Sequence, residues 1–193
     1  MATSKVKWYS RQGLWALFLI CAFPLHAWTL ILAFRDFSWV AARTNSWDAI
    51  GVVSYGMIFA FIESLVVFLV AALLGFLAPR RWDEDRRIAL LGVLALGAAL
   101  WAMVGQLYFI WGVSLPGQII HFLAQSEHPL RILYSASLVL VAATVLFPAY
   151  LVLSSNKAFR FTQGLIERLA LLTWLYLVLD FAGLVIVIIR NLQ

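Results

Sequence analysis

The sequence predicts an all-α integral membrane protein: one domain over residues 1–193, built as a bundle of five transmembrane helices. Of the 193 residues, 64% are hydrophobic, and the mean hydropathy is +0.95, whereas soluble domains are about 45–50% apolar. Five apolar runs reach the length of about 20 residues that a spanning helix needs. None alternates apolar with polar residues as barrel strands do. Backbone in lipid must satisfy its own hydrogen bonds, so each run is expected to be helical.

Charged residues or turn-forming residues bound the predicted spans. Arg11 precedes the first span and Arg35 follows it, while Pro79 and two arginines end the second. The five predicted spans cover approximately residues 12–34, 49–78, 88–113, 132–153 and 169–189.

The distribution of Lys and Arg predicts an orientation. Ten of the 14 basic residues flank the spans on the side of the N-terminus, and four flank the other side. Because basic residues stay in the cytoplasm, we expect a cytoplasmic N-terminus and an external C-terminus. The first apolar run continues to Phe34, past signal-peptide length, which indicates an uncleaved anchor. We therefore expect a multi-pass protein of the plasma membrane.

The longest predicted external loop covers residues 114–130. Pro116 suits the first turn of a helix, and Ile119, Ile120 and Phe122 could form an apolar face. This pattern predicts a short helix that lies in the outer membrane interface.

Polar side chains inside apolar spans are the candidate functional residues. The candidate polar intramembrane site comprises His26, Glu63, Gln106, Tyr134 and Asp180. Glu63 and Asp180 fall near the membrane midplane, where an ionised carboxylate costs at least about 2.5–3.5 kcal/mol. Each is therefore expected to be protonated, paired, or facing a wet cavity. His26 is the titratable base closest in depth, so we expect it to contact Glu63 or Asp180.

A stripe of small residues lies beside Glu63. Gly56, Ala60 and Ser64 recur every four residues on one helix face, a pattern that permits close helix packing. We therefore expect Glu63, which borders the stripe, to face protein. Three interpretations of the polar residues stay open: structural hydrogen bonds between helices, an ion, proton or ligand site, and contact with another subunit.

Motifs for enzymatic chemistry are absent from the sequence. It contains no phosphate-binding loop, no paired-cysteine metal pattern and no G-x-S-x-G nucleophile motif. We expect no catalytic residue, metal, cofactor or nucleic-acid partner. The favoured hypothesis is a small non-enzymatic accessory or interaction subunit, with the lipid bilayer and another membrane subunit or its own copies as partners. One alternative is a carrier or proton-coupled transporter with an outward-facing pocket around Glu63 and Asp180. The other is a lipid-modifying membrane enzyme.

Overall fold

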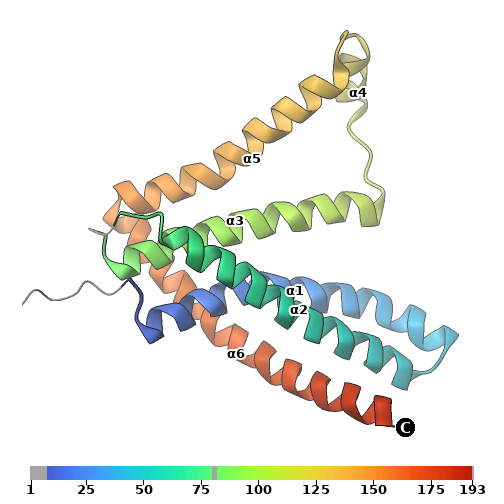
Figure 1. Cartoon of the computed structure of the whole chain (residues 1–193). Coiled ribbons are helices and arrows are strands. Elements are labelled where there is room, and N and C mark those ends of the chain that lie inside the picture. Colours follow the sequence, from blue (N-terminus) through green and yellow to red (C-terminus); the bar gives the residue numbers. More distant parts are fainter. Residues whose placement is uncertain (1–7, 80–81, 193) are drawn as a thin grey trace, which may run out of the picture.

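The computed structural model describes residues 8–79 and 82–192, apart from the side chain of Phe109. Over these residues every regular element is a helix (Figure 1). Five of the helices are long and apolar enough to cross a membrane, which confirms a multi-pass, all-helical protein. The elements are α1 (Arg11–Arg43), α2 (Ser46–Gly75), α3 (Glu84–Trp111), α4 (Gly117–Ala124), α5 (Pro129–Ser154) and α6 (Asn156–Leu192).

Local side-chain chemistry sets several helix ends. The Ser10 hydroxyl caps α1 by accepting the Gly13 N–H at 2.9 Å. The Asn45 side chain caps α2 by accepting the Asp48 N–H at 2.8 Å, which satisfies a donor that the helix itself cannot. α3 ends where Gly112 adopts a φ of 59°, the left-handed conformation that favours glycine.

Two helices extend well beyond their predicted spans. α1 continues to Arg43, and α6 already begins at Asn156. The apolar runs marked only the lengths suited to hydrocarbon, while the flanking residues 35–43 and 156–168 contain no proline that would stop a helix. The short α4 lies within the predicted 114–130 loop, and its location at the membrane interface stays a prediction.

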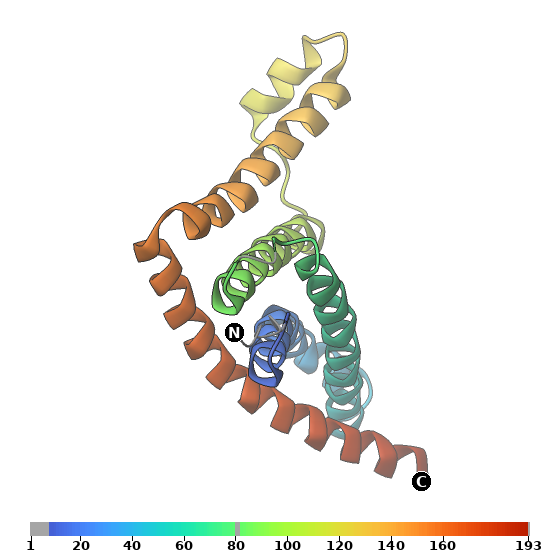
Figure 2. The ribbon, with the colours of Figure 1, turned by 60° about the vertical axis from the view of Figure 1, so that its left-hand side comes forward.

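α1 lies at the centre of the bundle, between α2, α3 and α6 (Figure 2). Its residues Leu17, Ile20 and Cys21 are fully buried. The core cluster around them draws on five helices and consists of Leu17, Ile20, Cys21, Ala71, Ala89, Leu91, Val152 and Ile166.

Polar contacts fasten the end of the bundle where α1 begins, called here the inner end. Arg87 is only 1% exposed, and its guanidinium donates to the carbonyl oxygens of Trp8 and Trp82. The Glu84 carboxylate accepts the Ser10 N–H at 2.6 Å and the Ser10 hydroxyl at 2.8 Å. The start of α1 is thereby held against the start of α3.

A second set of contacts closes the outer end of the bundle. Arg190, near the end of α6, donates to the Asp48 carboxylate at 2.7 Å and to the Trp47 carbonyl at 2.6 Å. Asn191 donates to the Tyr55 hydroxyl at 2.8 Å. These contacts join α6 to the start of α2.

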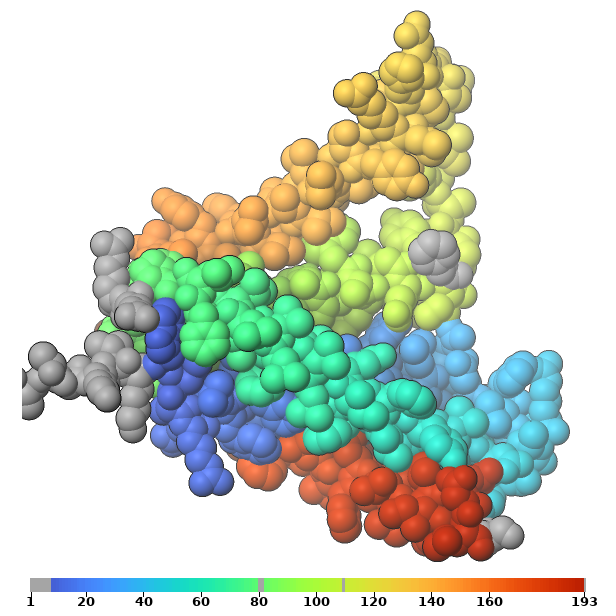
Figure 3. Space-filling view, in the orientation of Figure 1, coloured from blue at the N-terminus to red at the C-terminus, as the bar shows by residue number. Residues whose placement is uncertain are grey.

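α5 leaves the bundle over its outer half (Figures 1 and 3). Towards the inner end, Val145 packs against Gly97 of α3, and Thr144 accepts a hydrogen bond from the Trp101 indole at 2.8 Å. The buried residues of α5, Ala149 and Val152, also lie in this inner part. Towards its N-terminal end α5 diverges from α3 (Figure 1), and among the described residues α4 packs against α5 alone.

Five crossings require the two chain ends to lie on opposite sides of the membrane. We expect a reporter fused at the N-terminus to be cytoplasmic and one fused after Gln193 to be external. A fusion in the loop that follows Pro79 should again report the cytoplasm. Activity measurements with paired reporters that work only inside or only outside the cell check this. Both ends on one side would contradict five crossings.

Candidate functional site

His26 of α1 and Asp180 of α6 form a buried polar pair in the bundle. The His26 Nε2 and Asp180 Oδ2 atoms are 2.8 Å apart, and the two side chains are 0% and 11% exposed. The expected contact between His26 and a midplane carboxylate is therefore present, and Asp180 is the partner.

The parallel packing of α1 and α6 positions this pair. Two turns towards the inner end, the Thr173 hydroxyl lies 3.0 Å from the Leu19 carbonyl oxygen. Seven residues separate Leu19 from His26, and seven separate Thr173 from Asp180. A shared seven-residue spacing keeps the same faces of two parallel helices together. The two polar contacts therefore lie along one line between α1 and α6, called here the His26–Asp180 seam.

The hydrogen bonds of His26 fix where its protons lie. Its Nδ1 is 2.8 Å from the Ala22 carbonyl oxygen, which can only accept, so Nδ1 carries a hydrogen. The contact between Nε2 and Asp180 then needs one further proton. Either a doubly protonated His26 faces a carboxylate, or a neutral His26 accepts a hydrogen bond from a protonated Asp180. The pair is electrically neutral in both arrangements, which reduces the cost of burying it.

The second oxygen of Asp180 is not satisfied within the pair. Oδ1 is buried and has no hydrogen-bond partner among the described residues. An unpaired buried polar atom costs free energy, so the pair is stabilised by the contact between Nε2 and Oδ2 and by its packing.

Close packing surrounds the pair. The Tyr176 ring stacks on the His26 ring, with centroids 5.9 Å apart and an interplanar angle of 8°. One turn from Asp180, α6 approaches the backbone of α2, and a Cβ on Gly183 would lie 3.3 Å from the Ser54 carbonyl oxygen. These contacts hold both ring and carboxyl in place.

Glu63 does not face protein as the sequence predicted, because its side chain is exposed. It lines a groove of about 300 Å³ between α1 and α2 that also includes Asp36. Successive side chains are turned by about 100° around a helix. The neighbouring Ser64 is directed into the bundle, with 0% exposure, so Glu63 lies on the rim. No described residue makes an ion pair or hydrogen bond with it.

The small-residue stripe of α2 does pack closely. Ala60 is 1% exposed and Ser64 is fully buried. A Cβ on Gly56 would lie 3.3 Å from the Thr29 methyl group, which places the stripe against α1.

The two remaining candidate residues lie apart from the His26–Asp180 pair. Gln106 of α3 accepts a hydrogen bond from the Trp28 indole. Tyr134 of α5 is 70% exposed. Of the five candidate polar residues, the structure brings only His26 and Asp180 into direct contact.

Sequence reasoning missed two residues that matter here. Arg87 is one of the basic residues that flank the predicted spans, yet it is buried and joins two segments. Thr173 is a single hydroxyl in an apolar span and is not among the candidate residues. Its seven-residue spacing from Asp180 is the signal that could have placed both on one seam.

Neither the protein-family models, nor the curated proteins, nor the solved structures include a match to this chain. Its function is therefore inferred from its own residues.

Removing either partner of the His26–Asp180 pair should destabilise the fold, and the two losses should not be additive. We expect His26→Ala and Asp180→Ala each to lower the free energy of unfolding by about 1–3 kcal/mol, since each leaves a buried polar partner. In the double variant, the loss of unfolding free energy should be smaller than the sum of the two single losses by about 0.6–1.7 kcal/mol. Asp180→Asn should lower the free energy of unfolding less than Asp180→Ala does, because the Asn amide can donate a hydrogen bond to Nε2.

Reversible unfolding in mixed micelles measures these free energies. Glu63→Ala serves as the matched control, because that carboxylate is exposed and lacks a described partner. Strictly additive losses in the double variant would contradict direct coupling.

Proposed function

We propose that this protein is a non-enzymatic interaction subunit of a larger membrane assembly. We further propose that the outer half of α5 contacts a transmembrane helix of a partner. The observation that carries the proposal is the divergence of the N-terminal half of α5 from the bundle, where α4 is the helix beside it (Figures 1 and 3).

The exposed face of α5 has the composition of a helix interface. A groove of about 1070 Å³ runs along it, lined in its apolar part by Ser135, Ala136, Val139 and Ala143. Small and hydroxyl-bearing residues let helices approach closely in lipid and hydrogen-bond across the contact. The Ser135 hydroxyl has no hydrogen-bond partner among the described residues. A partner helix would supply one, whereas lipid tails cannot.

The outer end of the same groove is charged. Glu127, His128 and Arg131 line it there. Both signs of charge at headgroup depth would fix the register and orientation of a bound helix more than they would add affinity. An apolar middle with a polar rim is the usual arrangement at protein interfaces.

The candidate polar residues support this function better than they support a carrier. A carrier with the predicted pocket needs Glu63 and Asp180 to share one cavity. Glu63 lines the groove between α1 and α2, while Asp180 is paired with His26. The neutral, tightly packed pair has the character of a structural hydrogen bond between helices.

A proton-coupled carrier is the second candidate, and one observation favours it. The proton between His26 Nε2 and Asp180 Oδ2 has two positions that keep their hydrogen bond, and intramembrane pairs of this kind occur in proton relays. Proton uptake by vesicles that contain the purified protein tests it. Asp180→Asn should abolish uptake under this function, and unchanged uptake would eliminate it.

Purification in a mild detergent tests the interaction subunit directly. We expect native mass spectrometry to show a discrete complex with fixed stoichiometry, whose mass distinguishes copies of this chain from a different partner. Ala136→Trp should fill the α5 groove and release the partner. Leu171→Trp is the matched control, because Leu171 is 73% exposed on α6, away from that groove.

A strictly monomeric wild-type protein would contradict the proposal. Equal effects of Ala136→Trp and Leu171→Trp on the complex would also contradict the placement of the interface on α5.

A further inference from the structure

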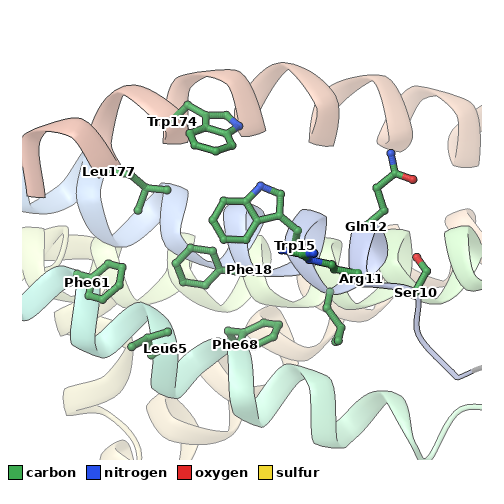
Figure 4. A pocket seen from close by; sticks show the side chains of 11 residues that line it. Ser10, Arg11, Gln12, Trp15, Phe18, Phe61, Leu65, Phe68, Trp174 and Leu177 are labelled. Carbon is green, nitrogen blue, oxygen red and sulfur yellow. The ribbon is translucent and has the colours of Figure 1, made fainter. Parts of the chain in front are cut away.

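A large apolar groove opens near the inner end of the bundle, between α1, α2 and α6 (Figure 4). Its volume is about 1010 Å³, at the upper end of the range for small-molecule sites. It lies away from the exposed face of α5 and shares no lining residue with the groove there.

Aromatic side chains from all three helices form the floor of this groove. Phe18 of α1 is 5% exposed and makes edge-to-face contacts with Phe61 and Phe68 of α2, at centroid distances of 6.1 and 5.8 Å. Trp15 of α1 lies 5.4 Å from Trp174 of α6. Such ring contacts hold the floor in a defined shape.

The rim of the groove is open sideways. Trp15 and Trp174 are 41% and 52% exposed, and Leu65 is 39% exposed. All three lie on helices long and apolar enough to cross the membrane. Their exposed surfaces therefore face lipid, and the groove is accessible from the bilayer.

Polar groups gather at one end of the groove, where α1 begins. Figure 4 shows Ser10, Arg11 and Gln12 at this end, and Phe61 and Leu177 at the other. The exposed Arg11 guanidinium makes no ion pair or hydrogen bond with any described residue. The first turn of α1 contains no acidic residue, so its free N–H groups add to a positive potential.

One carboxylate, that of Glu84, lies near this end of the groove and bears on its net charge. Glu84 accepts two hydrogen bonds from Ser10. Burial raises the pKa of the neighbouring Tyr9, Arg87 lowers it and Glu84 raises it, so charges of both signs act on this end of the bundle. Glu84 is thus engaged within the protein, and Arg11 remains available to an anion.

We propose that this groove binds an anionic phospholipid of the leaflet on the N-terminal side. Arg11 holds the headgroup phosphate, to which a guanidinium can donate two parallel hydrogen bonds. An acyl chain lies along the aromatic floor towards Leu177. The ten basic residues on this side of the spans draw anionic lipid to the surface. A soluble phosphate would leave the apolar floor uncovered, which is why a lipid is the occupant.

Native mass spectrometry of the full-length protein in detergent tests the site. Three probes are compared: phosphatidylglycerol, phosphatidylcholine with the same chains, and glycerol phosphate. We expect retained adducts with phosphatidylglycerol, several-fold fewer with phosphatidylcholine, and none with glycerol phosphate. Arg11→Gln should weaken phosphatidylglycerol binding about tenfold, since a hydrogen bond to a charged group contributes about 1.5 kcal/mol or more.

Matched variants separate this site from general charge effects. Arg160→Gln removes the same charge from another exposed arginine on the same side, one that no described residue pairs with, and should leave binding unchanged. Leu65→Trp should fill the apolar half and reduce binding although Arg11 is intact. Unfolding temperatures confirm that each variant is folded.

Three results would overturn the proposal. The first is equal retention of phosphatidylglycerol and phosphatidylcholine. The second is an equal loss in Arg11→Gln and Arg160→Gln. The third is glycerol phosphate binding as strong as that of phosphatidylglycerol.

Discussion

The rest of the structure depends on the packing of α1 against three other helices. α2, α3 and α6 each contact α1, and its residues Leu17, Ile20 and Cys21 are fully buried. Because these neighbours occupy the sides of α1, the His26–Asp180 seam and the aromatic groove both form on it. Among the described residues, α5 packs only against α3, α4 and α6 and makes no contact with α1.

Two polar contacts inside the bundle carry no net charge. The His26–Asp180 pair is neutral as a whole in either arrangement of its protons, and the Thr173 hydroxyl is satisfied by backbone carbonyls. The ionised partners at the outer end, Arg190 and Asp48, lie near the helix ends. Lipid penalises a charge at the midplane far more than a hydrogen bond between neutral groups. The placement of these groups follows depth, whereas Glu63 is exposed within the apolar helix α2.

Most of the fold could be predicted from the sequence, because the bilayer imposes a length and a hydrophobicity on every span. The same constraint of depth predicted that His26 would contact a midplane carboxylate. Depth says nothing about which way a side chain faces. Glu63 is exposed, whereas the next residue, Ser64, is buried. Hydropathy cannot distinguish two neighbouring positions in a span that is apolar all round.

The divergence of α5 and the burial of Arg87 were also beyond the sequence. Apolar residues occur on every side of α5, so hydropathy does not show which face packs on α3 and where that packing stops. Arg87 lies in a cluster of charged residues that indicates solvent. Its burial depends on carbonyl groups of Trp8 and Trp82, which only the folded chain brings together.

The length of α6 has a mechanical consequence. At 37 residues and 1.5 Å per residue it spans about 55 Å, more than the whole bilayer. Its inner part contacts α3 and α5, and its outer end is fastened to α2 through Arg190. A continuous helix of this length joins the two ends of the bundle directly. A displacement of its inner end would therefore be carried along the helix to the start of α2, which Arg190 contacts.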